Sequence, residues 1–250
     1  MDTEKLIVFG TVSFLMSIIS AIGGGGGGFI TTPLAIFLGL TPQQAIATGK
    51  VGGLGTTSGS LEGLTKVKIY RWNKVIPLMA LAAIVGLTAP FVIKNLDNDI
   101  YRRLIGAMLI LLIPVIWYRK IGVQEQKPAA WHRIVAIPLL VATMFMQAIF
   151  SSGMGSLVVL VLMGLMGMKA LEANVTKRFS QVILNSLLVL GLIGSKLILW
   201  NVALVIFVGN IVGSSIGSRI ALRKGDKFVT QVFIILMLVS GLILIFGGNT

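Results

Sequence analysis

The sequence predicts an all-α integral membrane protein built from two inverted repeats of about five hydrophobic segments each, including short re-entrant or broken helices. Three observations predict this class. Of the 250 residues, 56% are hydrophobic and only 12% are charged, whereas soluble domains carry about 25% charged residues. Several apolar runs reach the roughly 18 to 20 residues that cross a hydrocarbon core. The sequence also matches itself at an offset of 128 residues, the distance from Trp72 to Trp200.

Ten apolar segments follow one another along the chain. In the first half they lie near Leu6–Ile22, Phe29–Leu40, Pro42–Leu64, Trp72–Ile93 and Ile100–Tyr118. In the second half they lie near Ile134–Phe150, Ser156–Met168, Ala170–Gly194, Trp200–Ile220 and Phe228–Phe246. The predicted organisation is therefore a first transmembrane repeat of residues 1–120, a connector of residues 121–133, and a second transmembrane repeat of residues 134–250.

Internal duplication is the better account of the match between the halves. At the same offset, Gly25 falls on Gly153, and Trp72-Asn73 falls on Trp200-Asn201. Matches among Leu and Val arise easily by chance in so apolar a chain. A Trp-Asn pair that recurs at the same offset is less easily explained by chance, because the chain has four tryptophans in all. A fixed period of this kind is the signature of a repeated architecture.

The charges of the loops predict the orientation. The segments Glu62–Lys74 and Arg219–Lys227 each carry four basic residues and one acidic residue, whereas Gly194–Val202 carries one basic residue. Basic loops stay in the cytoplasm. The loop Glu62–Lys74 is then inside while its repeat mate is outside, so we expect the halves to be inverted, the connector to be cytoplasmic and both termini to be external.

Glycine interrupts one apolar segment in each half. Six glycines separate Ile22 from Phe29, and Phe150–Leu157 interrupts the second half at the corresponding place. Each glycine costs a helix about 1 kcal/mol relative to alanine. Paired breaks in two halves point to a transporter's binding site. The following segment, Phe29–Leu40, would measure about 18 Å as a helix, which predicts a re-entrant hairpin, and Thr41 is predicted to cap the next helix.

The breaks and nearby polar residues form the candidate site. Helix N-termini at the glycine tips attract anions. A basic residue inside a membrane segment is a candidate functional group, although a lysine can also extend to the interface and hydroxyls can simply bond neighbouring helices. The candidate substrate-binding residues are Gly25, Gly26, Gly27, Gly28, Thr48, Lys50, Ser151, Ser152, Gly153, Gly155, Thr176, Lys177 and Arg178.

Several classes of function are excluded. The chain has no cysteine and one histidine, His132, and its eight carboxylates fall at termini, in loops or at helix ends. We therefore expect no enzyme, no metal site and no cofactor. The formal charge of +13 is explained by basic loops beside anionic lipid, so nucleic acid is not an expected partner. The expected partners are the lipid bilayer and a small anion; the oligomeric state, a homo-oligomer included, stays open.

Four stretches resemble the TauE/SafE family of bacterial membrane transporters, the sulfite exporter family. They are Ile22–Phe29 running into Pro33-Leu34, Gly39–Lys50, Gly153–Ser156 and Gly209–Arg219. The resemblance covers nearly the whole chain. It departs in the second half, where the pair Lys177-Arg178 leaves open which residue matches the family's single lysine.

The resemblance implies a multi-pass protein of the bacterial plasma (inner) membrane that exports or takes up sulfur-containing anions such as sulfite, sulfonates or sulfoacetate. The expected function is a secondary transporter or facilitator with a midplane site between the inverted repeats. Two alternatives stay open: a channel-like anion pore, and a non-transporting membrane scaffold or accessory subunit.

Overall fold

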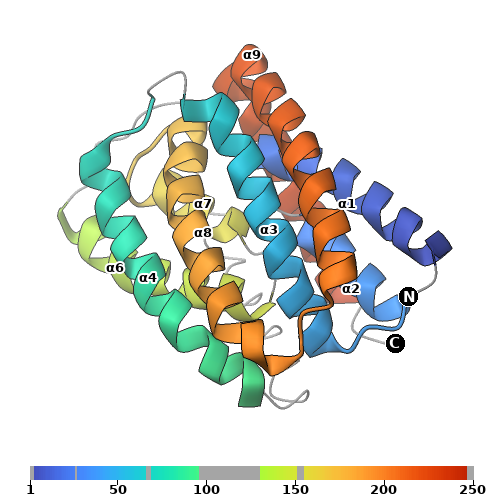
Figure 1. The fold of residues 1–250 in the computed structure, drawn as a ribbon. Coiled ribbons are helices and arrows are strands. Elements are labelled where there is room, and N and C mark those ends of the chain that lie inside the picture. The colour runs from blue at the N-terminus through green and yellow to red at the C-terminus, as the bar shows by residue number, and fades with distance from the viewer. Residues whose placement is uncertain (1–2, 26, 66–68, 96–129, 151–154, 247–250) are drawn as a thin grey trace.

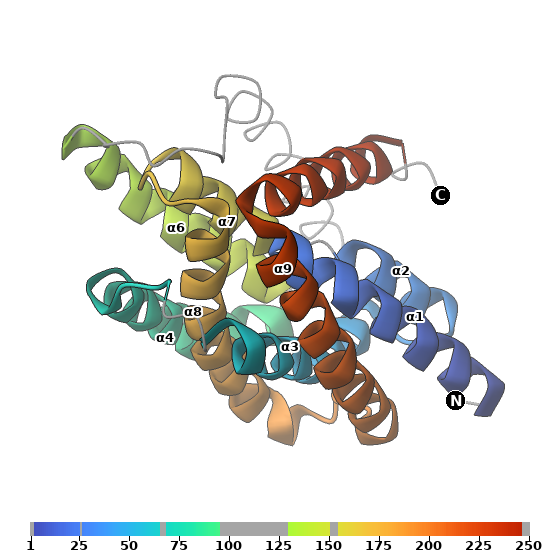
Figure 2. The same ribbon diagram turned by 90° about the horizontal axis from the view of Figure 1, so that it is seen from above.

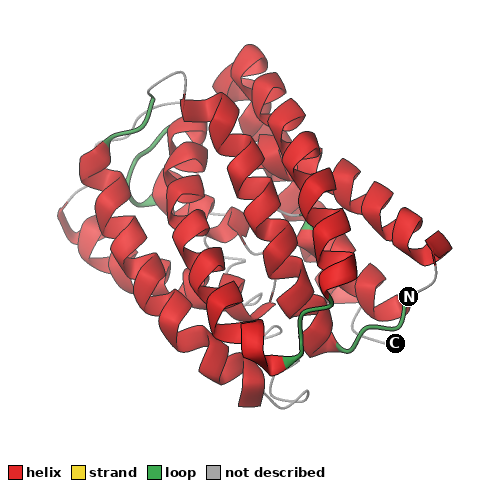
Figure 3. Cartoon of the chain, viewed as in Figure 1, coloured by secondary structure: helices red, strands yellow, loops and turns green. Residues whose placement is uncertain are grey.

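The computed structural model describes residues 3–25, 27–65, 69–95, 130–150 and 155–246. These residues form helices joined by short loops, without a strand among them (Figure 3). The helices, shown in Figure 1, are α1 (Thr3–Gly23), α2 (Gly28–Phe37), α3 (Pro42–Leu64), α4 (Trp72–Asn95), α6 (Ala130–Phe150), α7 (Gly155–Gly164), α8 (Ala170–Leu192), the 3-10 helix η3 (Ile193–Ser195) and α9 (Trp200–Phe246).

The predicted class, a multi-pass helical membrane protein, is confirmed. Within the described ranges, four stretches are long and apolar enough to cross a membrane: Thr3–Gly23, Trp72–Ile93, Ala170–Ser195 and Trp200–Ile235. Large apolar side chains such as Phe37 and Phe91 are exposed on the outside of the bundle, where lipid would cover them. The predicted segment Ile100–Tyr118 and most of the connector lie outside the described residues.

The helices of the two halves correspond at the offset found in the sequence. Pro42 begins α3 and Ala170 begins α8, 128 residues later, and both helices have 23 residues. At this offset α1 corresponds to α6, α3 to α8, and α4 to the first part of α9. The contacts between the halves follow the same correspondence: α3 and α1 pack on α9, and their counterparts α8 and α6 pack on α4. In Figure 1, α3 and α8 run in opposite directions.

The start of α3 forms as its sequence predicts. The backbone N–H of Thr41 donates to Gln44 Oε1 at 3.1 Å, and the Gln44 N–H donates to Thr41 Oγ1 at 3.3 Å. Pro42 occupies the first turn, where its missing N–H is not needed. This reciprocal cap fixes where α3 starts after the short helix α2 and sets the register of the residues that α3 carries toward the centre.

The last two predicted segments are one interrupted helix. The backbone of Gly225 has φ 78° and ψ −176° and is not helical, so α9 bends there (Figure 2). Asp226 follows the bend, and its Oδ1 accepts a hydrogen bond of 2.8 Å from the backbone N–H of Leu171 at the start of α8. This hydrogen bond connects α9, just after its bend, to α8, the helix that carries Lys177 and Arg178.

Glycines let α3 and α9 approach closely. A Cβ on Gly55 would lie 2.4 Å from the carbonyl oxygen of Phe207, and one on Gly59 would lie 2.2 Å from that of Ile211. Small residues at such contacts replace the hydrophobic driving force that helices lack inside lipid. The glycine-rich part of α3 is thus a surface that packs closely against α9.

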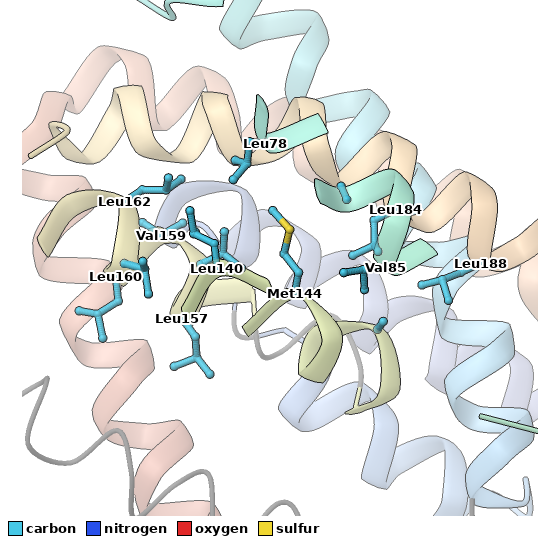
Figure 4. Packing of buried hydrophobic residues seen from close by; sticks show 14 of the residues in the cluster. Leu78, Val85, Leu140, Met144, Leu157, Val159, Leu160, Leu162, Leu184 and Leu188 are labelled. Carbon is cyan, nitrogen blue, oxygen red and sulfur yellow. The ribbon is translucent and has the colours of Figure 1, made fainter. Parts of the chain in front are cut away.

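A packed apolar core lies between α4 of the first half and α6, α7 and α8 of the second half. Leu78, Met144, Val159, Leu160 and Leu184 are each at most 3% exposed and lie together in one cluster (Figure 4). The short helix α7 is buried along nearly its whole length. Its N-terminus is consequently held in the interior of the bundle.

Candidate functional site

The two glycine tips meet inside the protein. Helix α1 ends at Gly23, and the next two glycines have φ of 76° and 158°, the region that glycine adopts readily. A Cβ on Gly25 would lie 2.6 Å from the backbone nitrogen of Ser156. The broken end of α1 therefore lies against the first residues of α7, and the candidate residues Gly25 and Gly155 come together from opposite halves of the chain.

Three basic side chains are buried beside these breaks. Lys50, Lys177 and Arg178 are each 1% exposed. The Lys50 Nζ donates to the carbonyl oxygen of Gln147 at 2.5 Å, and the Arg178 Nη2 donates to that of Ser20 at 2.6 Å. Since Ser20 and Gln147 lie in the last turns of α1 and α6, each half caps the broken helix of the other half with a cation.

Lys177 and Arg178 are both inside, so neither is a plain loop charge. The Lys177 Nζ donates to the carbonyl oxygen of Gly24. Asn174, one turn earlier on α8, donates to the carbonyl oxygens of Ala21 at 3.1 Å and Ile22 at 3.3 Å. Together with Arg178, these side chains donate hydrogen bonds to the carbonyl oxygens that are left unpaired where α1 ends. The charged groups of Lys177 and Arg178 thus each contact a backbone carbonyl.

The charge itself is not balanced within the described part of the chain. The ion pairs there join Glu172 to Arg71 and Lys74, and Glu62 to Arg219, so none includes the three buried cations. A cation near a helix C-terminus gains about 0.3–2 kcal/mol, whereas the desolvation of each buried ion costs several kcal/mol. The carbonyl contacts offset only part of that cost, and an anion would offset more.

The surroundings of Lys177 bring hydrogen-bond donors together at the start of α7. A Cβ on Gly155 would lie 2.1 Å from the Lys177 Nζ and 3.5 Å from Gln147 Nε2, so both groups lie at the first residue of α7. A cation is disfavoured at a helix N-terminus, which carries partial positive charge itself. Gln147 is 2% exposed, and its Nε2 has no partner among the described residues. These donors converge where an anion would be stabilised.

The remaining candidates are distributed around this point. Gly27 and Gly28 stand at the start of α2. Thr48 accepts a hydrogen bond of 3.1 Å from the backbone N–H of Leu199, so its hydroxyl joins α3 to the loop before α9. Thr176 is fully buried, and its Oγ1 has no partner among the described residues. The other candidates, Gly26, Ser151, Ser152 and Gly153, lie outside the described residues.

Sequence reasoning missed several residues of the site. Asn174 holds the end of α1 through its hydrogen bonds to Ala21 and Ile22, and Gln147 brings an amide nitrogen without a partner among the described residues to the start of α7. A polar residue three positions before Phe150 in an apolar segment was the signal for Gln147. Ser13, Ser17 and Ser20 are buried on one side of α1, and their spacing of four and three residues marks one helix face.

Comparisons with known proteins cover nearly the whole chain. A protein-family model described as "Sulfite exporter TauE/SafE" matches residues 9–244. A "Probable membrane transporter protein" of Haemophilus influenzae is 24% identical over 93% of this chain and 91% of its own length. The "Probable membrane transporter protein YfcA" of Escherichia coli K12 is 23% identical over 95% of this chain and 88% of its own length. No solved structure matches the chain significantly.

Proposed function

The chain belongs to the TauE/SafE sulfite exporter family and is a multi-pass membrane transporter, and from this premise we propose that it carries small sulfur-containing oxyanions. Sulfite, sulfonates and sulfoacetate are the candidates. The proposed mode is secondary transport, with the anion bound between two inverted repeats where the broken helices meet.

One observation carries the proposal: Lys50, Lys177 and Arg178 are fully buried beside the start of α7, and no carboxylate of the described chain pairs with them. An oxyanion would accept hydrogen bonds from the Lys177 Nζ and the free Gln147 Nε2. It would also face the N-terminal dipole of α7. These groups recognise charge and oxygen atoms, which sulfite and sulfonate groups share.

Transport by the purified protein tests this function. We expect liposomes containing the protein to take up radiolabelled sulfite, thiosulfate or sulfoacetate in a saturable manner, with unlabelled anion competing and empty liposomes as the control. Uptake that never saturates would favour the channel-like pore. No uptake of any of these anions, by protein that is correctly folded, would contradict the proposal.

The inverted arrangement is supported by contacts at the two ends of the bundle. Thr48 near the start of α3 bonds to Leu199, which follows the end of α8. Lys74 at the start of α4 bonds to Glu172 in the first turn of α8. The start of α8 thus lies near the end of α3, and the two mates are antiparallel.

We predict that the loops after the two mated helices lie on opposite sides of the membrane. In this cysteine-free chain, Lys196→Cys should react with an impermeant maleimide in intact cells. Asn73→Cys, which follows α3 and is also exposed, should react only after permeabilisation, because basic loops remain in the cytoplasm. Labelling of both from the same side would refute the inverted arrangement.

A difference between the two ends favours a carrier over a pore. At one end Glu172 Oε1 lies 3.0 Å from Lys74 Nζ and 3.5 Å from Arg71 Nε, and the rings of Tyr70, Trp72 and Phe179 contact one another edge-on or tilted. At the opposite end, the mate of Glu172 is Gln44, which lines a cavity of about 470 Å³. We infer that the end with Glu172 is closed and the end with Gln44 is open, as expected of a carrier with alternating access.

The ion pair at the closed end should limit access to the interior. Thr176 lies one turn after Glu172 on α8 and is fully buried, so a cysteine there reports opening. A pair of this kind contributes up to about 1 kcal/mol, roughly a fivefold shift in population. We expect Glu172→Gln to speed maleimide labelling of Thr176→Cys two- to fivefold. Glu62→Gln, which removes the exposed pair with Arg219, is the control. If Thr176→Cys were labelled equally fast alone, with Glu172→Gln and with Glu62→Gln, the ion pair of Glu172 would not limit access.

A further inference from the structure

A small cavity lies at the start of α2. It measures about 40 Å³ and is lined by residues of α1, α2, α3 and α9. By the same measure a water molecule needs about 10–15 Å³, so there is space for roughly three waters, comparable with an anion of three or four oxygens. Hydroxyls and an amide make up its polar lining, and they come from Ser13, Ser17, Ser20, Thr31, Thr32, Thr56 and Asn210.

Two polar atoms in this lining have no partner among the described residues. Ser13 is 3% exposed, and its Oγ makes no hydrogen bond there. Asn210 Nδ2 donates to the carbonyl oxygen of Gly52 at 3.0 Å, which fixes the amide orientation and leaves its Oδ1 without a donor. Buried polar groups are almost always satisfied. A guest that both accepts and donates hydrogen bonds would satisfy these two atoms.

The corresponding space in the second half is filled. At the offset of the repeat, Thr31, Thr32 and Thr56 become Val159, Leu160 and Leu184, which pack in the apolar core of Figure 4. Gly49 becomes Lys177, whose side chain reaches the start of α7. One half thus presents a cation at a helix N-terminus, and the other presents an uncharged, hydroxyl-lined space at the equivalent helix N-terminus.

We propose that the cavity at the start of α2 is a second binding site for a small inorganic oxyanion, through which the anion passes to or from the site at Lys177. This rests on the proposed function, from which it takes the anion. The N–H groups at the start of α2 have no partner inside their helix and line the cavity through Gly27 and Gly28. A singly protonated oxyanion such as hydrogensulfite would accept from these donors and donate to Asn210 Oδ1.

The absence of charge in this lining distinguishes its role from that of the Lys177 site. None of the described residues that line the cavity is basic or acidic, so an anion would be held there by hydrogen bonds from uncharged donors, without a cation to balance its buried charge. Weak holding suits a site on a path, because the anion must leave again. The small volume also favours an inorganic oxyanion over a sulfonate with a carbon chain.

Gly49 allows the cavity to be filled without disturbing the helix. A Cβ added at Gly49 would meet nothing within 4 Å, and leucine is a better helix former than glycine. We expect Gly49→Leu to lower sulfite flux in liposomes at least about tenfold, because the added side chain over-fills the path. The dissociation constant of the tighter site at Lys177 should stay within about twofold of the parent in the same purified protein, since the groups around Lys177 are untouched, whereas binding at the second site should be lost.

A matched control is Gly164→Leu at the end of α7. An added Cβ there also meets nothing within 4 Å, and Gly164 does not line the cavity. The Gly164→Leu protein should transport like the parent. Ser13→Ala should lower flux while folding normally. Parental flux in both Gly49→Leu and Ser13→Ala would overturn the second site. If the parent itself neither bound nor moved sulfite, thiosulfate or sulfoacetate, the proposed function would fail instead.

Discussion

Gly25→Ala is expected to lower transport more than tenfold and to lower the thermal stability of the purified protein. The added Cβ would lie 2.6 Å from the backbone nitrogen of Ser156 and 3.0 Å from the carbonyl carbon of Gly155, neither of which can rotate away. Relieving such contacts costs about 1–3 kcal/mol and would push α7 away from the end of α1. We therefore expect flux below one tenth of the parent, the factor that about 1.4 kcal/mol represents.

The control for this change is Gly164→Ala, at which the new methyl group meets open space and flux and melting temperature should match those of the parent. Melting is followed in detergent by intrinsic fluorescence, and flux is measured in liposomes. Gly25→Ala with parental flux would mean that the contact between the two glycine tips is not needed for transport.

Neutralising a buried cation is expected to weaken anion binding strongly. Lys50→Gln and Lys177→Gln should each raise the dissociation constant for sulfite about 10- to 100-fold, because a hydrogen bond to a charged group is worth roughly 1.5–3 kcal/mol. The effect should be largest at Lys177, which lies at the start of α7. Lys50 donates to the backbone carbonyl of Gln147, so it would affect the anion through the position of Gln147 and through its own positive charge. Isothermal titration of the purified proteins measures both constants.

Lys224→Gln removes the same charge from an exposed position on α9 and should leave the dissociation constant unchanged. Size-exclusion profiles identify any variant that fails to fold. If Lys50→Gln and Lys177→Gln were monodisperse and bound sulfite as tightly as the parent does, the buried cations would be structural caps for α1 and α6 and no more.

Patterns that depend on local chemistry predicted the fold well. Apolar length, the glycine breaks and the Thr41 cap are each determined by a few neighbouring residues, and the described helices follow them. The short helices α2 and α7, at 10 residues each, are shorter than the apolar segments that predicted them. The reason is that hydrophobicity continues into the turns after Phe37 and Gly164, where the helical hydrogen bonds stop.

The candidate site was predictable in its charges but not in its contacts. A basic residue within an apolar segment is easily recognised, so Lys50, Lys177 and Arg178 were found from the sequence. Their partners are backbone carbonyls at Gln147, Gly24 and Ser20, which carry no sequence signal because every residue has a carbonyl. The filled space of the second half and the cavity of the first could be contrasted only once the packing of both halves was known.

The central claim is that a small oxyanion binds among the buried cations at the start of α7, and anomalous diffraction tests it most directly. Selenite, the selenium analogue of sulfite, scatters strongly enough to be located in crystals of the native protein. We expect a selenium peak within hydrogen-bonding distance of the Lys177 Nζ and Gln147 Nε2, and its loss in Lys177→Gln. A protein that transports sulfite but shows no selenium at this position would contradict binding at the start of α7.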